Sequence, residues 1–457
     1  MTSAPTMPAD ALRLVRRYYA YAGIYTLAAS IIWGVNTLFL LDAGLSIAEV
    51  FIANAAFSVG TVLFEIPTGV VADTVGRRAS FLLSLLVLAG STLAYVALSQ
   101  AGAGVVAFSI ASVFIGIGFT FYSGAMEAWL VDGVRELGYE GEMDGIFATS
   151  QIVSGLAMLL GTIGGGLLGQ IDLALPFVVR SILLIALLGL AFFGMHDIGF
   201  KPRHITWRSL PSEANHVAAV GLRYGWGSRT LRLLMISGGI QMGFFFWAWY
   251  AWQPYFLELL EQDAVWVAGI VAALLSAAMI AGNSLVGFFT RYCGRRTTLL
   301  LWTAAGFSVG SLGVGLATSF PVALAFLLLI ALSMGVQMPV RQAFIHAIAP
   351  TEERATIVSF DSMFSGVGGV VGQSTLGVYS GRMGYAAAYV VGGIVTVAAV
   401  PIVLVARRAN PDADFFEGTH TVEKGGCIPH GVPQIAHVHA AVKPAKVLGT
   451  TDGEASI

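Results

Sequence analysis

The chain has 457 residues, of which 56% are hydrophobic and only 11% are charged, and its formal net charge is -2. Soluble globular domains carry roughly 25% charged residues, so this composition excludes an ordinary soluble protein and places the chain in a lipid bilayer. The basic residues are scattered in pairs and form no long patch, which argues against nucleic acid as a partner. The two cysteines, Cys293 and Cys427, lie far apart and predict neither a structural disulfide nor a metal framework.

The first apolar run extends from about residue 18 to 41 and follows Arg13, Arg16 and Arg17. The apolar core of a signal peptide is shorter and is followed by a small-residue cleavage site. This run is long enough to cross about 30 Å of hydrocarbon, so we expect an uncleaved first membrane helix.

Similar runs, each closed by charge, Gly or Pro, recur along the chain and predict twelve membrane spans. Their approximate cores are 18–41, 48–72, 79–99, 104–131, 146–171, 177–196, 233–256, 264–290, 298–318, 321–349, 356–380 and 385–406. The sequence therefore predicts an all-α integral membrane protein.

The distribution of basic residues predicts the orientation of the spans, because Lys and Arg favour the cytoplasmic side of short loops. The even-numbered loops and the tail hold nearly all of them, among them Arg77, Arg78, Arg135, Lys201, Arg223, Arg291, Arg295, Arg296, Arg354, Arg407 and Arg408. The exceptions are Arg180 and Arg341, which lie inside spans, and Arg382 on an outer loop. We expect a plasma-membrane protein with both termini in the cytoplasm.

The longest gap between spans divides the chain into two halves of six helices each, 18–196 and 233–408. The connecting segment 197–232 is basic and is predicted to hold a surface-lying amphipathic helix, with apolar residues at Trp207, Leu210, Val217, Leu222 and Trp226. Residues 1–17 form a cytoplasmic N-terminus, and residues 409–457 are predicted to be a disordered cytoplasmic tail. Cys427 and the tail histidines match no standard metal site, so no cofactor is expected.

The most specific motif in the chain reads Gly69-Val-Val-Ala-Asp73-Thr-Val-Gly76-Arg77-Arg78 and lies between the second and third spans. It resembles the signature loop of the major facilitator superfamily of secondary transporters. A degenerate copy, from Gly287 to Arg296, follows the second span of the second half, with Arg291 in place of the aspartate. Repeated halves are typical of transporters that work by alternating access, with the substrate site near mid-membrane.

The resemblance implies that this loop is a conformational latch. Asp73 would face the positive N-terminal end of the eleventh span and hold the halves together in the outward-open state. The gating residues expected from the motif are Gly69, Asp73, Gly76, Arg77 and Arg78. Asp361 is a further gating candidate near the start of the eleventh span, where charges are more often simply solvated.

Two carboxylates inside spans, Glu65 and Glu127, are candidates for proton coupling, because a membrane-embedded acid commonly marks an ion or substrate pathway. The alternative is a structural cap or a permanent ion pair. Arg341 in the tenth span lies at a depth similar to that of Glu127. We hypothesise that these two residues pair across the halves and close the cytoplasmic side when the cavity faces outward.

The fifth span contains Gly155, Gly161, Gly164, Gly165, Gly166 and Gly169. Such a run predicts close helix packing. It also resembles the glycine-proline-glycine signature of drug:proton antiporters, but Thr162 stands in place of the proline. The fourth span lacks the buried arginine usual in that group, so any proton coupling is expected to be arranged differently.

The family resemblance implies a substrate cavity lined by the first, fourth, seventh and tenth spans. The candidate binding residues there are aromatic or carry an amide: Trp33, Asn36, Tyr122, Gln241, Phe245, Trp249, Trp252, Gln253 and Gln337. A wide aromatic surface with few amides suits an amphipathic or cationic organic molecule better than a sugar.

Together these features predict a monomeric secondary transporter in the lipid bilayer, most simply a proton-driven exporter of a small amphipathic drug or metabolite. The alternative within the same class is an importer or proton symporter of a small nutrient. An enzyme would need a polar catalytic cluster, and a channel would need a repeated polar ring; the spans show neither pattern.

Overall fold

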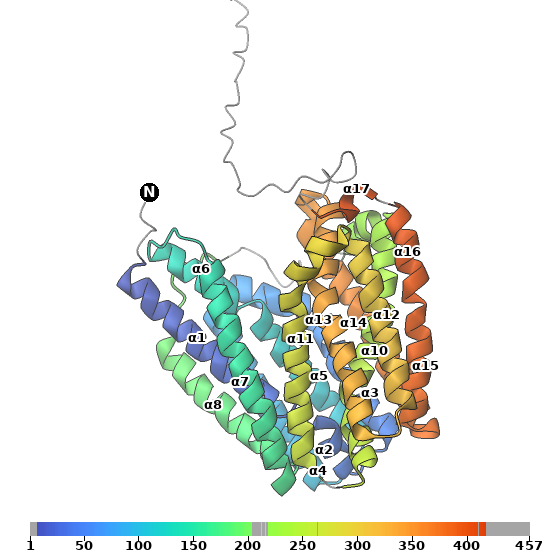
Figure 1. The fold of residues 1–457 in the computed structure, drawn as a ribbon. Helices are drawn as coiled ribbons and strands as arrows, with labels where there is room; N and C mark the ends of the chain where they lie inside the picture. Colours follow the sequence, from blue (N-terminus) through green and yellow to red (C-terminus); the bar gives the residue numbers. More distant parts are fainter. Residues whose placement is uncertain are drawn as a thin grey trace, which may run out of the picture. The chain divides into compact units, whose positions relative to one another are not determined.

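The computed structural model describes residues 7–202, 212, 215, 218–262, 264–409 and 411–416. Within these residues the secondary structure is helical apart from a single bridge between Arg295 and Phe415. Figure 1 shows the helices packed side by side as a bundle. The twelve predicted spans are present, which confirms the all-α membrane architecture.

The first half contains eight helices because two of its spans are broken. They are α1 (Ala9–Ser30), α2 (Asn36–Asp42), α3 (Ile47–Thr74), α4 (Arg77–Gln100), α5 (Val105–Ser123), α6 (Met126–Glu136), α7 (Asp144–Ile171) and α8 (Leu175–Gly194). The first span is divided into α1 and α2, and the fourth into α5 and α6. Hydropathy does not register either break, since the intervening residues remain apolar.

The second half begins after a short π-helical segment, η2 (Gly221–Trp226). Its helices are α10 (Arg229–Leu260), α11 (Val265–Cys293), α12 (Arg296–Leu316), α13 (Phe320–Ile348), α14 (Arg354–Met383), α15 (Tyr385–Val397), α16 (Ala399–Ala409) and α17 (Pro411–Asp414), with a short turn, η3 (Thr351–Glu353), before α14.

Ten spans in the described residues are long and apolar enough to cross a membrane. The first span and α14 do not meet this criterion of length and hydropathy. The first span is interrupted between α1 and α2, and α14 carries Asp361, Gln373 and several serines among its apolar residues. Both lie against other helices, so their polar groups need not meet lipid.

The glycines of α7 bring it close to two neighbours, as the sequence predicted. A Cβ on Gly165 would lie 1.8 Å from the carbonyl oxygen of Ile31, and one on Gly166 would lie 2.6 Å from the Cα of Gly269 in α11. Backbones can approach this closely only where side chains are absent. The glycine run therefore packs α7 against the first span and against the second half.

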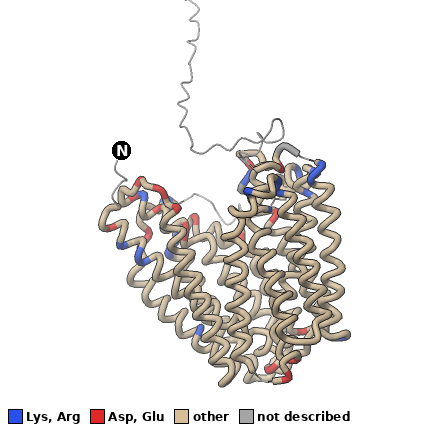
Figure 2. Tube along the Cα trace, in the orientation of Figure 1, with Lys and Arg blue, Asp and Glu red and all other residues tan. Residues whose placement is uncertain are grey.

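The two halves meet along two helix pairs, α3 with α14 and α7 with α11. Along α3, contacts with α14 run from Ala48 near Gly381, through Phe51 near Gly377, to Val62 near Gly366. Figure 1 shows α1, α6, α7 and α8 diverging from the second half toward the end that carries the N-terminus. The arginines of the α3–α4 and α11–α12 turns and of α16 lie at that end (Figure 2), which we call the basic end; the other is the opposite end.

Two predictions about connecting segments need comment. The surface helix predicted for 197–232 falls partly outside the described residues, including Trp207, Leu210 and Val217. At its described end Leu222 is exposed and Trp226 packs on Phe364, with ring centroids 5.4 Å apart.

The predicted disordered tail does not begin at residue 409. Residues 411–416 are ordered, because Asp414 is fully buried against the start of α12. The remainder of the tail, from residue 417, lies outside the described residues.

Candidate functional site

At the opposite end, a group of hydrogen bonds joins the halves through the broken first span. The backbone N–H of Thr37 donates to Oε1 of Gln253 at 2.9 Å, and Nε2 of Gln253 donates to the carbonyl oxygen of Trp33 at 2.9 Å. The Thr37 hydroxyl donates to the carbonyl oxygen of Tyr250 at 3.0 Å. Because a helix break leaves backbone groups without intrahelical partners, the division between α1 and α2 makes these groups available to the second half. We call this set the Gln253 seal.

Apolar contacts surround the Gln253 seal. Leu38 and Phe51 of the first half belong to the buried core of the second half. The ring of Phe51 lies 5.9 Å from that of Trp247, and a Cβ on Gly377 would lie 2.3 Å from the Cβ of Phe51. The opposite end is therefore closed by buried side chains as well as by hydrogen bonds.

Aromatic side chains from both halves face one another on the inner side of the seal. Trp33 meets Trp249 edge to face with centroids 6.3 Å apart, and Trp249 lies 5.7 Å from Phe245. In the first half, Tyr122 stacks on Tyr25 with centroids 3.6 Å apart. Trp33, Tyr122, Phe245 and Trp249 are all partly exposed. A role of these four residues in substrate binding stays a prediction.

The other predicted substrate residues are engaged within the protein. Asn36 donates to Asn54 at 2.9 Å, and the amides of Gln241 and Gln337 bond each other. Gln253 is fully buried in the seal, and Trp252 is only 1% exposed in the core of the second half. Trp252 nevertheless lines a small apolar pocket together with Phe245 and Trp249. A role of these five residues in substrate binding stays a prediction.

At the basic end, the signature loop forms ion pairs inside the first half. Arg77 contacts Asp73 at 2.6 Å and lies 3.9 Å from Asp132, so it links α3, α4 and α6. Gly69 has open space around it, whereas Gly76 has a φ of +131°, which favours glycine. The expected contact of Asp73 with the start of α14 stays a prediction.

Asp197, which follows the last span of the first half, caps the start of α4. Its Oδ1 accepts the backbone N–H of Arg78 at 2.8 Å, while Nη2 of Arg78 donates to the carbonyl oxygen of Phe192 at 2.7 Å. Burial raises the pKa of Asp197, against the opposing effects of the Arg78 N–H bond and of the charges on Arg78 and Arg77. Sequence analysis missed this residue because a single loop aspartate carries no periodic signal.

The degenerate copy of the loop is capped in the same way in the second half. Asp414, which follows the last span, accepts the backbone N–H and the hydroxyl of Thr297, each at 2.7 Å. Arg296 donates to the carbonyl oxygens of Ala413 and Phe415 at 2.5 and 2.6 Å. The repeat seen in the sequence therefore includes the residues that contact the loop. In each half, an aspartate that follows the sixth span caps the N-terminus of the third span.

Arg341 pairs within its own half, and its expected pairing with Glu127 when the cavity faces outward stays a prediction. Its Nη1 and Nη2 donate to the two carboxylate oxygens of Asp361 at 2.8 and 2.5 Å. A Cβ on Gly238 would lie 2.4 Å from Nη2, so α10 makes room for the guanidinium at that position. The sequence did not predict this contact, because depth in the membrane does not specify which helix a side chain faces.

The two proton-coupling candidates are both exposed side chains. Glu65 lies about one turn from Val62, on the face of α3 that meets Gly366 of α14. Glu127 lies in the first turn of α6, close enough to Tyr18 and Tyr122 to interact with them electrostatically. Among the described residues neither carboxylate has an ion-pair partner, so the permanent ion pair considered for them is absent there.

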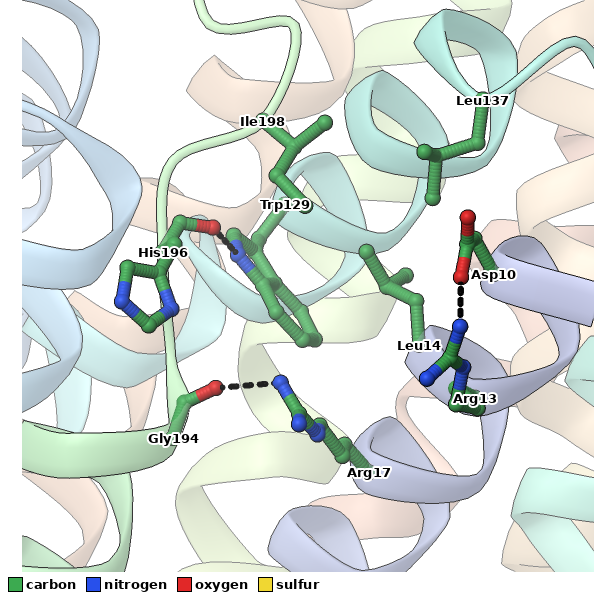
Figure 3. A pocket seen from close by; sticks show the side chains of 9 residues that line it. All are labelled: Asp10, Arg13, Leu14, Arg17, Trp129, Leu137, Gly194, His196 and Ile198. Carbon is green, nitrogen blue, oxygen red and sulfur yellow. Dashed lines mark hydrogen bonds and ion pairs between the residues drawn. The ribbon is translucent and has the colours of Figure 1, made fainter.

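A separate cavity of about 240 Å³ lies at the basic end, within the first half (Figure 3). Arg17 donates to the carbonyl oxygen of Gly194 at 2.9 Å, and Nε1 of Trp129 donates to that of His196 at 2.8 Å. Arg13 pairs with Asp10. These polar groups already have partners, and the cavity is formed by one half alone, so it is a poor candidate for a site that must open alternately to both sides.

Comparison with known proteins agrees with this architecture. The sequence matches the family model of the Major Facilitator Superfamily over residues 19–291 and 264–444. The chain belongs to that superfamily and is a membrane transporter of its type. It is 21% identical over 405 residues to the uncharacterized MFS-type transporter YxaM of Bacillus subtilis (strain 168), covering 85% of this chain and 94% of that protein.

Solved structures share the fold at low sequence identity. The nucleoside transporter NupG is 11% identical, with a TM-score of 0.72 over 86% of this chain and 98% of that one. A bacterial homologue of the human lysosomal transporter Spinster, in an inward-facing and occupied conformation, is 14% identical, with a TM-score of 0.63 over 90% and 100% of the two chains. The human organic anion transporter MFSD10 is 15% identical, with a TM-score of 0.57 over 87% and 100%.

Proposed function

We propose that the protein is a proton-coupled exporter of small amphipathic organic compounds that works by alternating access as a monomer in the plasma membrane. The observation that carries this proposal is the position of the Gln253 seal. It joins the halves at the opposite end, whereas the ion pairs of Arg77 and Arg341 at or toward the basic end each stay within one half.

In this proposal the basic end is cytoplasmic and the conformation is inward-facing. The excess of arginine at that end supports the orientation. Return to the outward-facing state would break the Gln253 seal and bring the basic ends of the halves together. Asp73 would then approach the N-terminus of α14, where the helix dipole favours a negative charge.

The substrate class follows from the partly exposed aromatic residues of both halves. Trp33 and Trp249 offer large apolar faces beside the seal, and Phe245 lies against Trp249. Tyr122 stacks on Tyr25 of α1, about two turns from Trp33. Such surfaces bind apolar ring systems well. The amides expected to bind polar groups are engaged in protein hydrogen bonds, which disfavours a polyhydroxylated substrate in this conformation.

Proton coupling is assigned to Glu127 and Glu65, since an exposed carboxylate in a membrane span can exchange protons as access alternates. The test is substrate-triggered proton movement in vesicles with a known pH gradient, comparing wild type with Glu127→Gln and Glu65→Gln. We expect Glu127→Gln to abolish proton movement while retaining substrate binding. Proton movement unchanged in both variants would contradict the coupling assignment.

An importer or proton symporter of a small nutrient is the second candidate. The fold is shared with a nucleoside transporter and with a POT family transporter in complex with 5-aminolevulinic acid. The same vesicles distinguish the two directions, because an exporter accumulates substrate in inside-out vesicles when protons leave the lumen, whereas a symporter moves substrate in the same direction as protons.

A further inference from the structure

Arg180 is a buried cation far from the basic end. It lies in the second turn of α8, which begins at the opposite end, and only 5% of the residue is exposed. It also departs from the distribution of the other basic residues, nearly all of which lie in loops or at helix ends. An ionisable side chain inside a membrane span is costly and usually serves binding or transport.

Among the residues that the structure describes, Arg180, unlike Arg341, has no carboxylate partner. Within the described part of the chain the structure records no ion pair or hydrogen bond for its guanidinium, and its Nε is buried without an acceptor. Arg341, by comparison, has both carboxylate oxygens of Asp361. A buried charge without a partner is strongly unfavourable, so the protein would gain stability from an anion at this position.

Three tyrosines surround the Arg180 guanidinium closely enough to interact with it electrostatically: Tyr25 and Tyr95 of the first half and Tyr250 of the second. The Tyr95 hydroxyl is hydrogen-bonded to that of Ser112. The structure records no hydrogen bond for the Tyr250 hydroxyl among the described residues, and the Tyr250 side chain is partly exposed. Tyr250, which belongs to the second half, is therefore a donor available to a ligand.

Arg180 and Tyr250 lie beside the Gln253 seal. The carbonyl oxygen of Tyr250 accepts the hydroxyl of Thr37, and the carbonyl oxygen of Trp33 accepts Nε2 of Gln253. Arg180 approaches the seal from the first half and Tyr250 from the second. A ligand that contacts both would connect the halves at the end that is closed in this conformation.

We propose that Arg180 and Tyr250 bind the carboxylate of an organic anion, and that such anions are the substrates of this transporter. The guanidinium offers two parallel N–H donors that match a carboxylate, and the Tyr250 hydroxyl adds a third donor. The apolar part of the anion lies toward Trp33 and Trp249. This inference rests on the proposed transport function and narrows its amphipathic substrates to those with one acidic group.

The test is calorimetric titration of the purified full-length protein with benzoate and naphthoate, each compared with its neutral amide. We expect at least one carboxylate to bind wild type about tenfold more tightly than its amide, as a hydrogen-bonded charge would give. Arg180→Gln removes this preference and leaves the affinity of the amide unchanged. Tyr250→Phe weakens carboxylate binding a few-fold.

Arg382→Gln is the matched control, because Arg382 is an exposed arginine at the opposite end and should leave the preference unchanged. The proposal is overturned if neither carboxylate shows saturable binding, or if Arg180→Gln keeps the preference for the carboxylate. The titration uses no membrane gradient. A failure of proton coupling in vesicles would therefore not affect the binding result. A failure of carboxylate binding would likewise not affect the test of proton coupling.

A thermal measurement separates binding from a structural role. Removing an uncompensated buried charge should raise the unfolding midpoint of the ligand-free protein in Arg180→Gln. Benzoate or naphthoate should raise the midpoint of wild type but not of the variant. A lowered midpoint together with an unchanged response to carboxylate would make Arg180 structural. If Arg180→Gln does not fold, Arg180→Lys keeps the charge without the planar fork and should show weakened carboxylate binding.

Discussion

The two ends of the bundle use different kinds of polar contact. At the opposite end, neutral groups of Gln253 and Thr37 bond across the halves. At the basic end, charged groups bond within a half: Arg77 with Asp73 and Asp132 in the first, and Arg296 with the segment after α16 in the second.

This difference shows how one end can open while each half stays intact. A neutral hydrogen bond contributes about 1 kcal/mol net, so a seal made of a few such bonds can break and form again during a transport cycle. Ion pairs and caps inside each half hold its helices together throughout the motion. The two ends therefore have separate tasks, and substitutions at each should have separate effects.

The largest expected effect comes from Gln253→Ala, which removes two hydrogen bonds between the halves. At about 1 kcal/mol each, their loss shifts the equilibrium roughly thirtyfold toward opening of the opposite end. Accessibility of a cysteine introduced at Leu38 to a water-soluble reagent should rise. Gln373→Ala is the matched control, because this buried glutamine donates to the carbonyl oxygen of Phe246 within one half. Equal labelling of both variants would show that Gln253 does not act as a seal.

Asp73→Asn should lower transport about tenfold while leaving the Gln253 seal closed, because it weakens one charged hydrogen bond at the basic end. Transport in vesicles and labelling at residue 38 measure the two effects independently. Asp10→Asn, which removes an exposed carboxylate paired with Arg13, is the control. Unaltered transport in Asp73→Asn would show that the signature loop has no part in the conformational change.

Asp414→Ala should lower the free energy of unfolding by about 1–3 kcal/mol, because it leaves the buried N–H and hydroxyl of Thr297 without their acceptor. Unfolding in detergent, followed by tryptophan fluorescence, measures the change. Asp10→Ala again provides an exposed comparison. If the two variants are equally stable, the segment 411–416 does not stabilise the second half.

The smallest expected effect is a change with pH in the stability difference between wild type and Asp197→Asn. Burial raises the pKa of Asp197 above its value in the unfolded chain, about 4. Ionised Asp197 therefore costs stability: the cost is absent below pH 4 and grows as pH rises through the raised pKa. Asp197→Asn removes it, so the difference in thermal midpoint between variant and wild type should increase over this window. A difference that falls with rising pH would contradict the direction of the shift.

The spans could be predicted from sequence because a bilayer requires about twenty apolar residues per helix, whichever neighbours that helix has. The division of the first span could not, since Trp33, Gly34 and Val35 are no more polar than the helices beside them. Yet this division supplies the backbone groups of the Gln253 seal. Its position depends on contacts with the second half, which hydropathy does not record.

The candidate site was predictable only in part for a similar reason. The aromatic residues Trp33, Phe245 and Trp249, predicted as substrate residues from their type and span, lie close together in the structure. The contact of Arg341 with Asp361 was not predicted, because depth in the membrane does not specify which helix a side chain faces. Asp197 and Asp414 were missed as isolated loop residues, although each follows the last span of its half and a comparison of the halves could have paired them.

The most direct test of alternating access is the distance between spin labels across the halves at both ends. The labels are attached to cysteines introduced into a protein in which Cys293 and Cys427 are replaced by serine. One pair is placed at Val75 and Tyr292 at the basic end, and another at Ile171 and Met383 at the opposite end. All four native side chains are exposed. Relative to wild type, Gln253→Ala should lengthen the Ile171–Met383 distance and shorten the Val75–Tyr292 distance. Two distances that change in the same direction, or only one that changes, would contradict alternating access through the Gln253 seal.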